Sequence, residues 1–143
     1  MIDVYSRFVV DKPLTNMRME TIMEKIKEML KELSKASGNK TRTRASASEP
    51  EKFPQNLNCD NQFNIPAFTK FFSEHGTKLY FSQPEQSHKN AIIERFWRTL
   101  ALLLQRMRSG IKNFDWAKEL PNAIKNYNTT FHRTLKATHQ EVF

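Results

Sequence analysis

The chain is organised around the stretch Ser87-His-Lys-Asn-Ala-Ile-Ile-Glu-Arg-Phe-Trp-Arg-Thr-Leu100. Within residues 87–109 the only acid is Glu94, and it is surrounded by basic side chains: Lys89, Arg95, Arg98, Arg106 and Arg108. A single carboxylate in a basic helix has two explanations. It is an ion-pair partner of Arg98, which lies one helical turn further on, or it is a metal ligand in a surface that receives phosphates. This stretch alone leaves both open.

Composition sets the class of protein and the class of partner. The 143 residues suit one domain, and 11 Phe and 2 Trp supply large apolar groups although only 38% of residues are hydrophobic. The net charge of +8 favours a polyanionic partner such as a nucleic acid, with a basic soluble protein without a special partner as the alternative.

Cysteine and histidine usage excludes several kinds of site. Cys59 is the only cysteine, so no disulfide forms within the chain, and we expect a reducing compartment. The four histidines lack the spacing of a zinc site. No apolar run has the length of a membrane span and no signal peptide begins the chain, so we expect no membrane association.

Hydrophobic periodicity predicts alternating strands and helices. The expected strands are two within residues 2–10, separated by a turn near Ser6-Arg7, and then residues 55–59 and 77–82. The expected helices are residues 17–33, 65–75, 87–109 and 114–127, with Gly76 and Gly110 ending the second and third of them. We expect a flexible loop at residues 34–54 and a polar C-terminal tail at residues 128–143.

Helix capping and helix faces add detail to this pattern. Ser87 is a candidate cap for the long helix, and Asn113 and Asp115 are candidate caps for the last one. The last helix is expected to place four apolar side chains on one face: Trp116, Leu120, Ile124 and Tyr127.

The order of elements predicts an α/β fold with a mixed central sheet flanked by helices. In such sheets ligands gather beyond the carboxyl ends of the strands, and Asp60 follows the strand at residues 55–59. A strand-end carboxylate and a helix-borne one, here Asp60 and Glu94, are hard oxygen ligands for a divalent ion. Taken alone, this pairing is weak evidence of a metal site.

Several blocks, taken in order, resemble the catalytic core of the retroviral-type integrases, the DDE enzymes of retroviruses, retrotransposons and Polinton-type transposons. The blocks are Asp3-Val-Tyr-Ser-Arg-Phe8, Asp60-Asn-Gln-Phe63, residues 68–76, Phe81-Ser-Gln-Pro84, Lys89-Asn-Ala-Ile-Ile-Glu-Arg-Phe-Trp-Arg-Thr-Leu100, Tyr127-Asn128 and His132-Arg133. The block at residues 89–100 is most similar to the Polinton and related integrases. The resemblance covers nearly the whole of residues 1–143.

This resemblance implies an RNase H-like fold and a polynucleotidyl transferase that depends on Mg²⁺ or Mn²⁺. Such enzymes process a DNA 3′ end and join it to target DNA. It implies that Asp60 and Glu94 are the second and third metal-binding catalytic acids. It also implies that four side chains contact DNA: Lys89, Asn90, Arg95 and Arg98.

The chain also departs from the family pattern. The turn after Asp60 is shorter and has no glycine, which puts the position of Asp60 in doubt. His139 stands where the family has proline. The family's first strand and first catalytic aspartate have no counterpart here. Asp3 matches a non-catalytic aspartate of the second strand, and whether Asp3 substitutes for the first acid stays open, with Asp11 a poorer candidate. The family's zinc-binding N-terminal region and C-terminal DNA-binding domain are not matched.

Three functional hypotheses follow. The first is an incomplete integrase core of a mobile element, active only when further sequence completes it. The second is a non-catalytic relic or domesticated module that still binds DNA, and the third is an oligomerisation or interaction domain. The resemblance implies DNA ends and target DNA as partners, self-association into a homo-oligomer, and location in the nucleus or another compartment that contains DNA.

Overall fold

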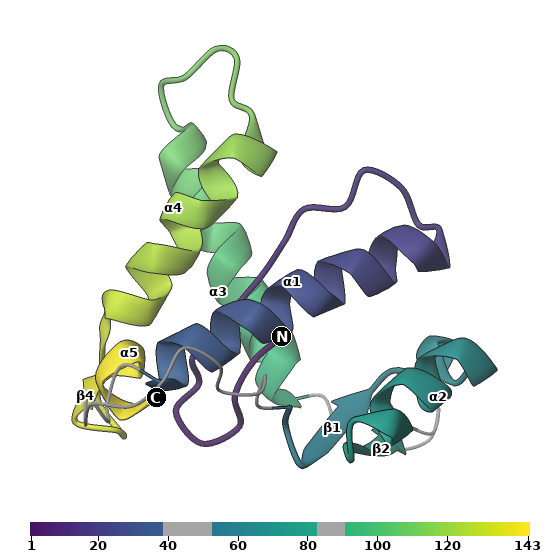
Figure 1. Cartoon of the computed structure of the whole chain (residues 1–143). Coiled ribbons are helices and arrows are strands. Elements are labelled where there is room, and N and C mark those ends of the chain that lie inside the picture. Colours follow the sequence, from purple (N-terminus) through teal and green to yellow (C-terminus); the bar gives the residue numbers. More distant parts are fainter. Residues whose placement is uncertain (39–52, 83–90) are drawn as a thin grey trace. The chain divides into compact units, whose positions relative to one another are not determined.

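A computed structural model describes residues 1–38, 53–82 and 91–143, and these form two units (Figure 1). We call Met1–Lys25 together with Ile92–Phe143 the terminal unit, and Ile26–Ala91 the central unit. Helix α1 (Met19–Gly38) begins in the terminal unit and continues into the central unit.

Helix α1 confirms the helix expected at residues 17–33 and extends beyond it. Ser34, Lys35 and Ala36 are compatible with a helix, so the helix continues to Gly38. The flexible loop expected from residue 34 onwards is therefore wrong for residues 34–38. Residues 39–52 of that loop lie outside the described residues.

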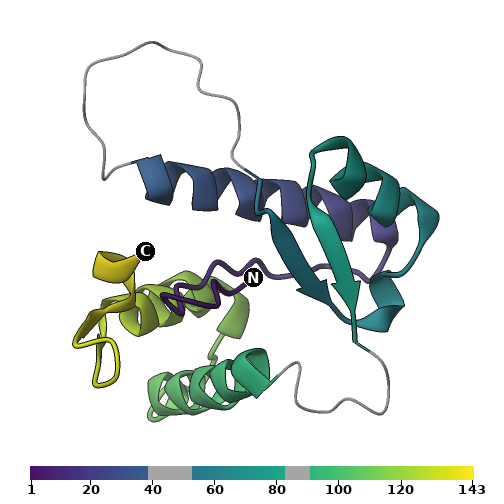
Figure 2. The ribbon, with the colours of Figure 1, turned by 90° about the horizontal axis from the view of Figure 1, so that it is seen from below.

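The central unit contains a strand–helix–strand arrangement. Strands β1 (Asn56–Cys59) and β2 (Lys78–Phe81) are parallel neighbours, and helix α2 (Pro66–Glu74) lies between them in the sequence (Figure 2). Pro66 opens α2 at a position where its missing N–H costs nothing. Gly76, with φ of 71°, ends the helix and turns the chain into β2. Both expected strands and the helix between them are confirmed.

Aromatic side chains fill the central unit. Phe68 and Phe72 of α2 are fully buried, with their ring centroids 4.8 Å apart. The Phe53 ring meets the Phe71 ring edge-on at 5.8 Å, and the Lys27 ammonium of α1 lies 5.2 Å from the centroid of the Phe71 ring. These rings supply the apolar area that a two-stranded sheet alone lacks.

The terminal unit is built on two helices that lie side by side, α3 (Ala91–Arg108) and α4 (Trp116–Thr129) (Figure 1). They enclose a core with the N-terminal residues; the buried residues are Val9, Phe96, Leu100, Leu120, Ala123 and Ile124. The turn between the helices contains Gly110 at φ 87°, as its predicted role as a helix breaker requires. Of the two candidate caps of α4, the carboxylate of Asp115 accepts the N–H groups of Ala117 and Lys118.

Residues 1–10 fold back as an antiparallel hairpin, with the turn where the sequence predicts it, but the two strands expected within residues 2–10 are reduced to one isolated bridge. The Val10 N–H donates to the Met1 carbonyl at 3.0 Å, and Ile2 and Val9 form a bridge. The turn depends on Asp3, whose Oδ2 accepts three hydrogen bonds: from the Tyr5 N–H, the Ser6 N–H and the Ser6 hydroxyl.

Asn128 joins this hairpin to α4. Its Oδ1 accepts the Val9 N–H at 2.9 Å, and its Nδ2 donates to the Val9 carbonyl at 2.8 Å. Asn128 is only 6% exposed, so the two bonds satisfy backbone groups that water does not reach.

The polar tail expected at residues 128–143 is an ordered part of the terminal unit. It continues from α4 into an antiparallel pair, β3 (Phe131–His132) with β4 (Ala137–Thr138), and ends in helix α5 (His139–Val142). His139 is 3% exposed, its Nδ1–H donates to the Ser6 carbonyl at 2.8 Å, and its ring stacks on Tyr127 at 4.5 Å. A buried histidine therefore holds the tail against the N-terminal turn.

The structure confirms a mixed α/β class. The strands that it describes form two separate two-stranded sheets, one parallel and one antiparallel, in place of the single mixed central sheet expected from the order of elements. The reason is that each strand pair belongs to one unit, β1 and β2 to the central unit and β3 and β4 to the terminal unit.

We predict that Asn128→Ala lowers the free energy of unfolding of the terminal unit by about 2–4 kcal/mol, because two buried backbone groups lose their partners. Urea unfolding followed by tryptophan fluorescence measures this, since both tryptophans, Trp97 and Trp116, lie in the terminal unit. The matched control is Asn126→Ala on the exposed face of α4. Equal losses in the two variants contradict the role of Asn128.

The stability of the terminal unit is also expected to fall as pH is lowered through and below the usual pKa of histidine. Burial lowers the pKa of His139 below its usual value, and Arg7 and His132 nearby act in the same direction. The unfolded chain therefore takes up this proton at a higher pH than the folded chain does. The stability is present above the unfolded pKa and is lost as pH falls through the window between the two pKa values.

The effect is measured by urea unfolding at a series of pH values, and one histidine accounts for at most about 1.4 kcal/mol per pH unit. His139→Gln, whose amide can still donate to Ser6, should flatten the profile. His75→Gln, at an exposed position of the central unit, should leave it unchanged. A profile that is unaffected by His139→Gln contradicts the assignment.

Candidate nucleic-acid interface

Glu94 lies in the first turn of α3 and its side chain is exposed. Helical spacing decides this, because Ile93 and Phe96 face the core of the terminal unit and turn Glu94 outwards. Arg95 and Arg98 are exposed on the same helix. Helix α3 therefore presents one carboxylate and two guanidinium groups to solvent within two turns.

These three charged groups are not paired with one another in the structure. The ion pairs found within single helices of the described residues include Lys70 with Glu74, at 3.9 Å. No such pair joins Glu94 to Arg98, and no acidic side chain in residues 1–38, 53–82 or 91–143 pairs with Arg95 or Arg98. The ion pair of Glu94 with Arg98 is thus not realised, and no acid of the described residues occupies either arginine.

Asp60 stands directly after β1, as the sequence predicts. Its Oδ1 accepts the Asn61 N–H at 2.8 Å and caps a single 3₁₀ turn, Asn61–Phe63. The Phe63 N–H then returns to the Asp60 carbonyl at 3.0 Å. The short turn without glycine is therefore closed by ordinary backbone conformations, and Asp60 keeps an exposed carboxylate at the strand end.

Asp60 belongs to the central unit and Glu94 to the terminal unit, so a metal site shared by the two stays a prediction. Each is an exposed carboxylate, the kind of hard oxygen donor that Mg²⁺ or Mn²⁺ takes. Asp60 also keeps Oδ2 without a hydrogen bond from any described residue. Within the described parts of the chain, no three His, Cys, Asp or Glu side chains gather closely enough to hold a metal ion.

The two aspartates considered as a substitute first acid are both engaged locally. Oδ2 of Asp3 accepts the three hydrogen bonds that form the N-terminal turn. Asp11 accepts the Lys12 N–H at 2.9 Å, and burial raises the pKa of its carboxyl, although the nearby amino terminus lowers it. Neither carboxylate has the exposure of Asp60 or Glu94.

Several candidates are not placed. Three of them lie outside the described residues: Lys89 and Asn90, the two DNA contacts expected before α3, and Ser87, the expected cap of α3.

Cys59, next to Asp60, is buried, and burial raises the pKa of its thiol to about 11. Cys59 is therefore an unreactive neighbour of the candidate acid.

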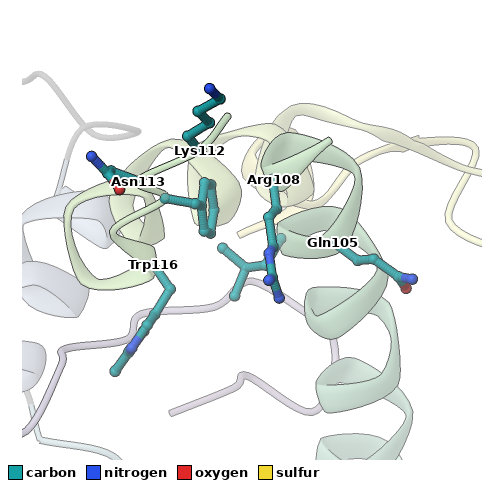
Figure 3. A pocket seen from close by; sticks show the side chains of 7 residues that line it. Gln105, Arg108, Lys112, Asn113 and Trp116 are labelled. Carbon is teal, nitrogen blue, oxygen red and sulfur yellow. The ribbon is translucent and has the colours of Figure 1, made fainter. Parts of the chain in front are cut away.

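The sequence did not indicate a hollow of about 420 Å³ at the turn between α3 and α4. Its lining residues are Leu104, Gln105, Arg108, Lys112, Asn113, Phe114 and Trp116. Figure 3 shows Arg108 and Trp116 extending to the same side of the turn, while Lys112 points the opposite way. We expected Trp116 on the apolar face of its helix, but it is 52% exposed, because the first position of α4 has no helical turn before it to cover the indole. In the sequence, Trp116 directly follows the candidate cap Asp115, and this place at the start of a helix was the available signal that the indole is exposed.

Comparison with known proteins adds no relative: no protein-family model matches the chain, and no curated protein matches it significantly. Within the described residues, no helix is both long and apolar enough to cross a membrane.

Proposed function

We propose that this chain is the catalytic core of an integrase-type polynucleotidyl transferase of a mobile element, and that it binds DNA through the exposed face of α3. The observation that carries the proposal is the set of Glu94, Arg95 and Arg98 on α3, exposed and without ion-pair partners among the described residues. Exposed guanidinium groups without an acidic partner can bind the phosphates of DNA and neutralise their charge.

The resemblance of the sequence blocks supports the enzymatic part of the proposal. In it, Asp60 and Glu94 hold Mg²⁺ or Mn²⁺, and such ions activate a nucleophile and stabilise the leaving oxygen in phosphodiester chemistry. The parallel pair β1–β2 with α2 between its strands is compatible with an RNase H-like sheet. Self-association on DNA and location in the nucleus, or in another compartment that contains DNA, belong to the proposal by resemblance.

A second candidate is a DNA-binding module without catalysis. It is favoured by the hydrogen bonds of Asp3. The Asp3 carboxylate was considered as a substitute for the first acid, but it accepts three hydrogen bonds that form the N-terminal turn. Incubation of the chain with duplex DNA ends and Mn²⁺ tests both candidates. Nicking or joining that disappears in Asp60→Asn and Glu94→Gln supports catalysis, whereas binding without joining fits the second candidate and also a core that is active only when further sequence completes it. If the chain neither binds nor joins DNA, the remaining hypothesis is an interaction domain.

The binding step yields a quantitative prediction. The double variant Arg95→Ala/Arg98→Ala should reduce the slope of log affinity against log salt concentration by about 2 for a blunt DNA duplex, because each phosphate contact contributes about 0.9. Fluorescence anisotropy between about 50 and 200 mM NaCl measures the slope.

The matched control removes the same charge from the neighbouring helix. Lys118 and Lys125 are exposed on α4, and the variant Lys118→Ala/Lys125→Ala should change the slope much less. If the two double variants have the same slope, the DNA does not lie on the α3 face. Duplex binding that is absent even at low salt overturns the proposed function.

A further inference from the structure

The hollow between the end of α3 and the start of α4 combines a flat apolar surface with positive charge. The Trp116 indole contributes the flat surface and is 52% exposed. The Arg108 guanidinium extends to the same side of the turn (Figure 3). An exposed indole and a guanidinium that line one hollow offer a stacking position for a planar group that carries negative charge.

The positive charge of this hollow is not neutralised from within the described residues. Arg108 has no acidic partner there. The nearest acid in the sequence, Asp115, is engaged: it accepts the N–H groups of Ala117 and Lys118, and it lies 3.6 Å from the Lys118 ammonium. Asp115 therefore stabilises the start of α4 and leaves the charge of Arg108 available.

The remaining lining is partly apolar. Leu104 and Phe114 supply apolar contact, while the amides of Gln105 and Asn113 extend away from Arg108 and Trp116 (Figure 3). The volume of about 420 Å³ lies at the lower end of the range of about 300–1,000 Å³ that small-ligand pockets occupy. It suits a group of the size of one nucleotide.

We infer that this hollow binds one unpaired nucleotide of a single-stranded nucleic acid, with the base stacked on Trp116 and the phosphate held by Arg108. Bases within a duplex are stacked on one another, so only an unpaired base presents a free face to the indole. The inference rests on the proposed DNA-binding function and adds to it a position for a single-stranded segment. The net charge of +8 also favours a polyanionic ligand such as a nucleic acid.

The test uses the chain with Trp97→Phe, which leaves Trp116 as the sole tryptophan. Titration with a short oligothymidine should quench the Trp116 fluorescence, since a stacked base quenches an indole. A blunt duplex and inorganic polyphosphate should quench much less, even where they bind. Anisotropy of the labelled oligothymidine gives the affinity of the otherwise native chain and of its variants.

Trp116→Ala and Arg108→Ala should each weaken oligothymidine binding by about tenfold, as expected for the loss of a base–aromatic contact or of a phosphate contact. Arg106→Ala is the matched control, because Arg106 is exposed two residues before Arg108 and does not line the hollow. Circular dichroism melting verifies that each variant is folded.

Each outcome decides the inference. Equal losses in Arg106→Ala and Arg108→Ala, unchanged binding in Trp116→Ala, or equal quenching by duplex and single strand overturns it. Quenching by an acidic peptide but not by oligothymidine assigns the hollow to a protein partner and also overturns it. Loss of duplex binding in Arg95→Ala/Arg98→Ala with oligothymidine quenching intact separates the two sites. If the native chain binds no duplex but oligothymidine still quenches Trp116, the proposed function fails and this inference stands.

Discussion

The two hydrogen bonds between the Asn128 amide and the backbone of Val9 hold the terminal unit together. They join residues 119 positions apart in the chain, and both are buried. Because Val9 is the buried residue that the N-terminal hairpin contributes to the core of α3 and α4, its placement affects how that core is closed. An amide is suited to this place, since it satisfies the N–H and the carbonyl of one residue at once.

The neighbours of Asn128 extend the same constraint. Tyr127 stacks on His139, and His139 donates to Ser6 in the turn that Asp3 forms. The hairpin, α4 and the C-terminal segment therefore support one another through a few buried polar groups. Helix α3 packs on this assembly with its apolar side, which leaves Glu94 and the arginines in solvent. The candidate DNA-binding face is thus a consequence of what the opposite side of the helix buries.

The sequence predicts local structure well where one physical signal acts alone. Apolar periodicity locates α1, α2 and α3. The short strand predicted at residues 55–59 places Asp60 at its carboxyl end. It fails where distant residues decide: the polar tail becomes ordered because His139 finds a carbonyl 133 positions away. It also fails at Trp116, whose apolar character predicts burial although the start of α4 leaves it half exposed. Asp60 and Glu94 belong to two separate units, so neither hydrophobic periodicity nor local geometry predicts whether the two carboxylates pair.

The central claim is that Glu94 faces DNA. Crosslinking tests it directly, because the thiol of Cys59 is buried with its pKa raised to about 11 and is therefore a silent background for one introduced cysteine. Glu94→Cys is incubated with a duplex whose 3′-terminal phosphate region carries a tethered disulfide, and Lys125→Cys on α4 is the control. The account predicts rapid, salt-sensitive crosslinking at position 94 and little at position 125. Equal yields at the two positions, or none at position 94 under conditions where the duplex is bound, would contradict it.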